Sequence, residues 1–421
     1  MKIKNLKLKN VGPFRDAELE FPQERVDGKI PVTIITGENG TGKSVIIDAI
    51  RMLFNFQAHI GRDIVSNAEN FQIAMEVIDQ NMFDDNDFFN DESVRAFINS
   101  DNYGYKDLLP YKSLFIQDTF YRSRSSKNTR PPNWVIEYWN SNLGKDNFEI
   151  INMSSIDITK AFIGALDGES SNVELTNFIC SVDYLRSSDD KQESEVGNFV
   201  YNLIKEIFKE CLVDGEFLSV RRQTLSPIVK VKDAEVTLDK LSSGNLLLIE
   251  RLIGLIRRMY SVCMLNNRPV SEMTLIEGIL LIDEVENHLH PQWQRRIVSI
   301  LQRMFPNLQI IMTTHSPFVV SSVENAKIYV CESKIDYSIV RDMSEDYSNL
   351  PVDEVLVSDV FGVSPFATKI SDIQEQRKAA IESGDKDKAK DLGDKLVKMN
   401  SNYFGFINLK ETLNCLQNEA H

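Results

Sequence analysis

The sequence predicts an α/β fold, in which short buried strands alternate with helices. Three apolar runs of strand length, at residues 32–35, 278–282 and 309–312, each end in a polar segment. A helical pattern of apolar residues follows the first run, at residues 45–50. Polar groups that follow buried strands are typical of sites at the carboxyl edge of an α/β sheet. Each of the three strand ends is therefore a candidate place for function.

The composition is that of a soluble globular protein with room for two or three domains. The chain has 421 residues, of which 42% are hydrophobic and 26% charged. Its longest apolar stretch, residues 246–265, contains four charged residues and cannot cross a bilayer without burying them. The N-terminal residues alternate apolar and basic, which predicts a strand rather than a signal peptide. We therefore expect a cytoplasmic protein with no membrane segment.

The cysteines and the net charge bear on two further properties, disulfide content and nucleic-acid binding. The five cysteines lie far apart with no C-x-x-C spacing, which predicts reduced and mostly buried thiols rather than a disulfide framework. The net charge of −15 means that the average surface repels nucleic acid. Any contact with DNA or RNA would need a local basic patch.

Residues 37–44 read GENGTGKS, the pattern of a phosphate-binding P-loop. Its glycines let successive N–H groups face phosphate oxygens, Lys43 reaches the β- and γ-phosphates, and Ser44 ligates Mg²⁺. A chance match is the alternative, but the strand before the loop and the helix after it argue against chance. We predict nucleoside triphosphate binding by Gly37, Asn39, Gly40, Thr41, Gly42, Lys43 and Ser44.

An insertion is predicted after the strand-like segment 71–79, where the sequence becomes acidic and rich in asparagine. Its one basic stretch, residues 121–134, contains two adjacent prolines and is predicted to be an exposed loop. The loop is either simply solvated or a nucleic-acid contact through Arg122, Arg124, Lys127 and Arg130, with Tyr121 and Trp134. A polar linker at 187–194 precedes a helix whose apolar face, from Val200 to Cys211, is predicted to be core.

Residues 241–245, LSSGN, open a long apolar helix. The free N–H groups at the start of that helix can bind phosphate. A plain N-cap at Ser242 or Ser243 on a core helix is the competing interpretation.

The buried strand at 278–282 ends in Asp283 and Glu284, the Walker B arrangement. Asp283 is placed to hold Mg²⁺, and Glu284 to orient and deprotonate the attacking water. Ordinary surface acids after an apolar strand are the alternative, which the presence of a P-loop disfavours.

The strand at 309–312 leads to His315, whose imidazole can hydrogen-bond a γ-phosphate or the attacking water. A lone histidine is more often structural. However, three of the five histidines, His288, His290 and His315, fall just after these strand ends, which favours a catalytic role for His315. Further on, residues 371–399 predict a helical hairpin with its break at 383–385.

In order and kind, these motifs resemble those of ABC-type P-loop ATPases of the SMC, RecF and OLD branch, which includes the stand-alone AAA_15 and AAA_21 types. The similar strings are NVGPFRDAELEF, TGENGTGKSVIIDAI, LIDEVENHLHPQWQRRI and TTHSPFVVSS, and the similarity covers residues 1–55 and 236–325. It implies an ABC-type ATPase head, with a P-loop core and an antiparallel β subdomain. A mostly helical insertion and a C-terminal helical hairpin would complete the chain.

The resemblance also assigns roles. Ser242, Ser243 and Gly244 become the signature motif, although Ser243 and Asn245 depart from the usual L-S-G-G-Q. Residues 286–289 become the D-loop, which leaves His290 structural. Gln80 and Gln117 both follow strand-like segments, and the choice between them for the Q-loop stays open.

Four regions follow from the motifs and the resemblance. Residues 1–80 form the first half of the ATPase head and 81–212 the helical insertion. Residues 213–345 form the second half of the head, and 346–421 a helical region suited to docking a partner.

The resemblance implies a head-to-tail homodimer, or a larger assembly of such dimers, because an ABC-type signature caps the γ-phosphate held by a second subunit. Mg²⁺ and ATP would be bound between the subunits.

Three biological roles for such an ATPase stay open. The first is a bacterial antiphage ATPase, like the PtuA, AriA or retron-associated types, that senses an intruder and controls a separate effector such as a nuclease.

The second use is a RecF- or SMC-like clamp for DNA repair or recombination, which would employ the basic loop. The third is an OLD-like nuclease with a degenerate C-terminal Toprim domain, for which Glu332 with Asp336, or Asp385 with Asp387, would supply acids. The sequence around the first pair lacks the glycine typical of such sites, and the second pair lies at the predicted turn of the helical hairpin. Both observations argue against nuclease activity in this chain.

Overall fold

The computed structural model describes residues 1–54, 64, 70–78, 93–99, 133–160, 164–169, 171–358, 361, 366 and 368–406. It divides into two compact units, Met1–Val352 and Asp353–His421. In the described part of the chain, no helix is both long and apolar enough to span a membrane.

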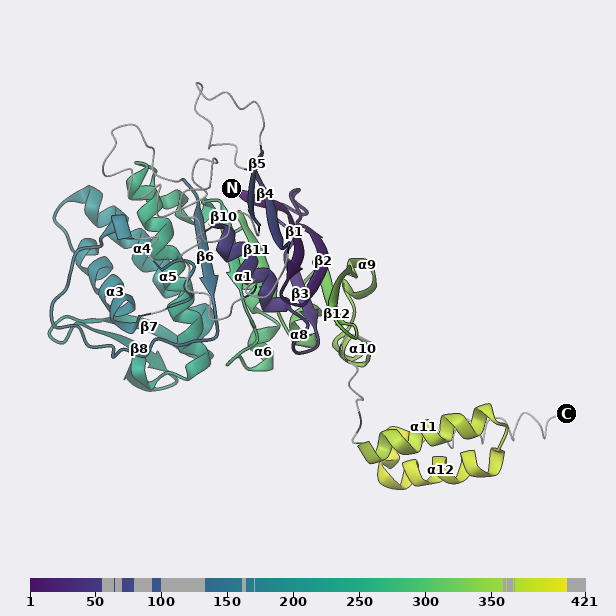
Figure 1. Ribbon diagram of the computed structural model, residues 1–421. Coiled ribbons are helices and arrows are strands. Elements are labelled where there is room, and N and C mark those ends of the chain that lie inside the picture. Colours follow the sequence, from purple (N-terminus) through teal and green to yellow (C-terminus); the bar gives the residue numbers. More distant parts are fainter. Residues whose placement is uncertain are drawn as a thin grey trace. The chain divides into compact units, whose positions relative to one another are not determined.

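A ten-stranded sheet runs through the first unit (Figure 1). Its strands, in spatial order, are β5 (Ser93–Asn99), β4 (Gln72–Ile78), β1 (Lys2–Val11), β2 (Phe14–Glu20), β13 (Ser338–Asp342), β12 (Lys327–Ser333), β3 (Thr33–Gly37), β11 (Leu308–Thr313), β10 (Gly278–Ile282) and β6 (Val135–Trp139). The last five run parallel, whereas β5, β4, β1 and β2 pair antiparallel. The predicted P-loop core with an antiparallel β subdomain is therefore confirmed.

The burial of each strand follows its sequence pattern. All residues of β3, β6, β10 and β11 are buried, as their continuous apolar runs predict for parallel strands covered on both faces. In contrast, β1 alternates, so that Leu6 and Leu8 are buried while Lys7 and Lys9 are exposed. The carboxyl ends of the parallel strands consequently form one edge, from which the polar loops emerge.

Three helices and a small sheet form a second layer of the first unit, and Figure 1 draws them on the β6 side of the large sheet. They are α3 (Asn172–Arg186), α4 (Lys191–Cys211), α5 (Ser243–Leu265), β7 (Gly215–Arg221), β8 (Ser226–Val231) and β9 (Ala234–Thr237). The predicted apolar face of α4 is buried from Val200 to Cys211. The predicted linker at 187–194 is wrong in its second half, because Asp190 caps α4 by accepting from the Glu193 N–H.

Shorter elements complete the first unit. The helices are α1 (Lys43–Phe54), α6 (Pro291–Gln294), α7 (Ile297–Met304), α8 (Pro317–Val320), α9 (Ser344–Tyr347) and α10 (Val352–Val357). The last of these, α10, continues into the second unit. The 3₁₀ turns are η1 (Ile158–Lys160), η2 (Leu238–Lys240) and η3 (Val270–Leu275). Although β6 lies inside the predicted insertion, it pairs with β10 of the main sheet. The division into four regions stays a prediction.

The second unit contains the predicted helical hairpin, formed by α11 (Thr368–Glu382) and α12 (Lys386–Met399), followed by α13 (Ser401–Phe404). Gly384 adopts φ +78° at the break, and Asp385 caps α12 by accepting from the Lys388 N–H. Its core is built on Leu396 and Phe404, packed against Phe366, Ile370, Ile373 and Val397.

Candidate functional site

The P-loop joins β3 to α1 and is tightly packed at two glycines. Gly37 has φ +137°, and a Cβ there would lie 2.2 Å from the Cys331 carbonyl oxygen on β12. Gly42 has φ +101°, and its Cβ would lie 2.6 Å from the Phe14 ring. Only glycine satisfies both the backbone angles and the close approach. Strand β12 and the β1–β2 turn therefore hold the loop in shape.

Lys43 is 5% exposed and points back onto the loop. Its Nζ donates to the carbonyl oxygens of Gly37 at 3.0 Å and Glu38 at 2.7 Å. Burial lowers the pKa of Lys43, and nearby acids, including Glu286 and Asp283, oppose that shift. An ammonium group held in this way can exchange carbonyl oxygens for phosphate oxygens without leaving the loop.

Three strand or helix ends bring hydroxyl and carboxylate oxygens together beside Lys43. Ser44 Oγ donates to Asp283 Oδ1 at 3.0 Å, and Thr313 Oγ1 donates to the same oxygen at 2.5 Å. Thr313 also accepts from the Glu284 N–H at 2.8 Å. Oxygen donors of this kind suit Mg²⁺, so the residues present fit that ion. Thr313 did not emerge from the sequence, although its place at the end of a buried strand was a usable signal.

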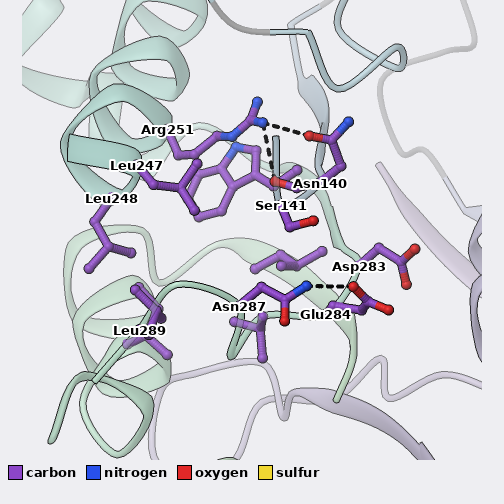
Figure 2. Close-up of a pocket in the computed structure, with 13 residues that line it drawn as sticks. Asn140, Ser141, Leu247, Leu248, Arg251, Asp283, Glu284, Asn287 and Leu289 are labelled. Atoms are coloured by element: carbon purple, nitrogen blue, oxygen red, sulfur yellow. Dashed lines mark hydrogen bonds between the residues drawn. The ribbon is translucent and has the colours of Figure 1, made fainter. Parts of the chain in front are cut away.

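Glu284 is held by its own loop. Its φ of +53° is unusual for a residue other than glycine, and its Oε2 accepts from Asn287 Nδ2 at 2.5 Å, as Figure 2 shows. Both residues line a small pocket of about 30 Å³ with Asp283. The Glu284 carboxylate is thus held by Asn287 in a pocket that Asp283 also lines.

His315 is tied to the loop after β10 through Glu286. The two carboxylate oxygens of Glu286 accept from the His315 N–H at 2.5 Å and from Thr314 Oγ1 at 2.7 Å. Burial raises the pKa of Glu286, whereas these hydrogen bonds oppose the rise. Besides burial, the charges of Lys43, Glu284 and Asp283 all act on the pKa of His315, so the ring lies near the P-loop lysine and the acids after β10. Sequence analysis assigned Glu286 only a place in the predicted D-loop.

The predicted signature lies at the start of α5. Ser242 Oγ accepts from the Asn245 N–H at 3.4 Å, so Ser242 is the N-cap, while Ser242 and Ser243 are both exposed. A Cβ at Gly244 would lie 2.3 Å from the His288 carbonyl oxygen. The predicted signature is therefore packed against the predicted D-loop of its own chain. Among the described residues, no hydrogen bond or ion pair joins it to residues 37–44.

The remaining candidates are structural or lie elsewhere. His290 caps α6, where its Nδ1 accepts from the Gln292 N–H at 3.3 Å. Glu332 pairs with Lys334 and Arg341, and Asp385 is the cap of α12. Within the described ranges, no group of acidic, histidine or cysteine side chains could form a further metal site. The candidates outside the described residues are Gln80, Gln117, Tyr121, Arg122, Arg124, Lys127 and Arg130. Trp134, predicted at the end of the exposed basic loop, is instead buried next to the start of β6.

Two family models match this chain. The AAA_23 model, described as "AAA domain", matches residues 5–248. The chain belongs to this AAA domain family. The AAA_21 model matches residues 183–321, and its description adds the AbiEii toxin and a type IV toxin–antitoxin system to the words "AAA domain". Together the two models span the P-loop, the predicted signature, Asp283, Glu284 and His315.

Curated relatives of this AAA-domain chain include a retron protein and a Septu protein that it matches over most of its length. It is 25% identical over 398 residues to "Retron Vc95 probable ATPase" of Vibrio cholerae serotype O1 biovar El Tor, covering 80% of this chain and 74% of that one. It is 24% identical over 349 residues to "Septu protein PtuA" of Bacillus thuringiensis, covering 78% of each.

Solved structures similar to the AAA-domain chain include SMC heads. One is an SmcHead bound to the C-winged helix domain of ScpA, with 16% identity, coverage of 81% of this chain and 98% of that one, and a TM-score of 0.44. Another is the SMC head domain from Thermotoga maritima, with 15% identity, coverage of 81% and 99%, and a TM-score of 0.41.

Replacing Glu286 with alanine in this AAA domain is expected to lower turnover more than nucleotide affinity. The change leaves the His315 N–H and the Thr314 hydroxyl without their acceptor, at a cost of about 1–2 kcal/mol in unfolding free energy. Glu286→Gln keeps the size and one acceptor oxygen and should lose less. Thermal unfolding and steady-state kinetics check both variants, and full turnover by Glu286→Ala would refute the positioning role.

His315 is expected to be neutral at pH 7 in the nucleotide-free AAA domain. Burial, followed by the charge of Lys43, lowers the pKa of His315 below its ordinary 6.5. The folded protein then binds fewer protons than the unfolded chain, so this residue reduces stability as the pH falls through about 6.5. NMR titration of the His315 imidazole C–H resonance measures the midpoint. The spectrum of the His315→Gln variant, which lacks this resonance, assigns it. A midpoint at or above 6.5 contradicts the expectation.

Proposed function

We propose that this AAA-domain protein hydrolyses ATP in a composite site shared by two copies, and that ATP-driven assembly controls a separate effector in bacterial antiphage defence. The proposal rests on the separation, within one chain, of the nucleotide-binding motifs from the predicted signature. The P-loop, Asp283 and His315 converge, while Ser242 and Ser243 are exposed at the start of α5. A second copy would supply the missing half of each site.

The nucleotide half is assigned to the P-loop. Its backbone N–H groups and Lys43 would bind the β- and γ-phosphates, because glycines allow the N–H groups to converge and the buried ammonium is already within the loop. Ser44 and Asp283 would hold Mg²⁺. When bound, this ion supplies positive charge that stabilises the phosphate oxygens.

The chemical step is assigned to Glu284 and His315. A water oxygen forms a bond to the γ-phosphorus while the bond from that phosphorus to the β–γ bridging oxygen breaks, and Glu284 takes the proton of the water. Neutral His315 would hydrogen-bond the γ-phosphate or this water. The bond from Asn287 orients the Glu284 carboxylate before ATP arrives.

The second half of the site is assigned to the signature. The first N–H groups of the 23-residue helix α5 have no partner within the helix and carry the positive end of its dipole. Presented by Ser243 and Gly244, they would cap the γ-phosphate bound to a second copy. Contact between Gly244 and His288 means that signature and D-loop would reach that copy together.

The defence role is supported by the relatives. Proteins named for retron and Septu systems match 80% and 78% of this chain. We place effector docking on the predicted C-terminal region 346–421, where Tyr403 and Phe406 are 56% and 62% exposed. This chain would be the sensor or regulatory subunit, and the cutting of nucleic acid would belong to the effector.

Phage challenge tests the defence role. A bacterial host carrying this gene with its neighbouring genes should form fewer plaques than a host carrying the Lys43→Ala version of the same set. Nuclease activity of the purified chain alone would overturn the separation of ATPase and effector. ATP turnover that DNA stimulates, and that Arg122→Glu with Arg124→Glu abolishes, would instead support the DNA-clamp alternative.

A further inference from the structure

A short loop, residues 164–169, lies between the two halves of the proposed site, and we name it the bridging loop. The Tyr138 N–H on β6 donates to the Ala165 carbonyl at 2.8 Å, so the loop follows the edge of the main sheet. Ala165 and Leu166 are buried. The loop belongs to neither the P-loop nor the signature, yet one buried arginine binds it from each side.

The first arginine comes from the P-loop helix. Arg51 on α1 is 3% exposed, and its Nε donates to the Leu166 carbonyl at 2.7 Å. Its guanidinium group stacks on the Tyr138 ring at 3.9 Å and pairs with Asp48 at 2.6 Å. Since Lys43 begins the same helix, a movement of α1 on phosphate binding would move Arg51 and the loop with it.

The second arginine comes from the signature helix. Arg251 on α5 is 4% exposed, and its Nη2 lies 3.0 Å from the Gly168 carbonyl. The same nitrogen lies 2.8 Å from the Asn142 carbonyl and 2.9 Å from Asn140 Oδ1, and Figure 2 shows Arg251 reaching Asn140. A Cβ at Gly168 would lie 2.5 Å from Asn140 Nδ2, so loop, β6 end and α5 are in close contact.

The end of β6 also contacts the acidic residues. The Asp283 N–H donates to the Trp139 carbonyl at 2.9 Å, in the register that pairs Trp139 with Ile282. Arg251, Asn140 and Glu284 line the same pocket. Buried arginine bonds to carbonyl groups are not readily replaced by water, and a connected network of this kind can transmit displacement between elements.

We propose that the bridging loop, held by Arg51 and Arg251, transmits ATP binding at the P-loop helix to the signature helix of the same chain. Arg251 is a positioning residue in this account. ATP on one chain would then order the start of α5 for a second copy. The inference rests on the proposed function, since it needs ATP at the P-loop and a signature that acts on another copy.

Hydrogen–deuterium exchange of the full chain, with and without Mg²⁺ and ATP, tests the coupling. Two peptides are followed, one over residues 37–44 and one over 241–250. Arg251→Met is compared with Arg257→Met, a matched control on the same helix whose arginine pairs with Glu174 at 2.7 Å and does not touch the loop. ATP is expected to protect residues 37–44 in all three proteins.

At residues 241–250, ATP should protect the unsubstituted chain and Arg257→Met, whereas in Arg251→Met this protection should fall at least about threefold. Unchanged protection in Arg251→Met, or none in the unsubstituted chain, would overturn the coupling. If Arg251→Met does not fold, Arg251→Lys decides in the same way, because it keeps the charge but reaches fewer carbonyl groups. If ATP does not protect residues 37–44 in the unsubstituted chain, the proposed function is overturned, and the coupling with it.

Discussion

Replacing Lys43 with alanine is expected to abolish ATP binding and therefore turnover. The Lys43 ammonium is the cation that donates to loop carbonyls at 3.0 and 2.7 Å, and it would donate to phosphate oxygens in their place. Charge-assisted hydrogen bonds of this kind contribute about 1.5–3 kcal/mol each, so affinity should fall at least about 100-fold. Isothermal titration calorimetry with ATP measures the loss.

The stability of this variant separates lost binding from unfolding. Burial lowers the pKa of Lys43, which means that the charged side chain is poorly solvated in the free protein. Removal of that charge should therefore cost little, and the nucleotide-free variant should unfold within a few degrees of the unsubstituted chain. Lys29→Ala, at an exposed position, is the control. ATP affinity within about threefold of normal in Lys43→Ala would contradict the assignment.

Replacing Glu284 with glutamine is expected to stop hydrolysis while ATP stays bound. Loss of a general base lowers rates about 10²- to 10⁴-fold. Glutamine has the same shape, and its side-chain oxygen can still accept from Asn287 Nδ2, so the loop should keep its structure. Single-turnover release of phosphate measures the effect, with Glu324→Gln at an exposed position as the control. Undiminished phosphate release by Glu284→Gln would remove Glu284 from the role of base.

Local patterns in the sequence predicted those parts of the fold that depend on neighbouring residues. Continuous apolar runs marked β10 and β11, and alternation marked β1. The start of α4 was missed although its signal was present, since Asp190 and Glu193 have the spacing of a helix cap. Strand β6 was absorbed into the insertion because its short run, VIEYW, stands far along the chain from the strands beside it.

Sequence analysis identified candidate site residues that belong to a recognisable motif. It missed the residues that reach the site only because neighbouring strands are aligned in register. Thr313 meets Asp283 because β10 and β11 pair Ile282 with Met312, a relation that no sequence spacing displays. Glu286 binds the next strand end through both carboxylate oxygens, and Arg251 binds carbonyl groups on two backbone segments that are far apart in the sequence. The proposed site would also depend on contacts between two copies of the chain, which the spacing of residues in one sequence does not display.

The mass of Glu284→Gln in solution with Mg²⁺ and ATP tests the composite site most directly. Light scattering should give at least twice the mass of one chain with ATP, and a single chain without nucleotide. Adding Ser243→Arg, which places a bulky side chain at the exposed start of α5, should restore the single-chain mass while ATP still binds. A single-chain mass for ATP-bound Glu284→Gln, or a dimer that persists with Ser243→Arg, would contradict a site completed by the signature of a second copy.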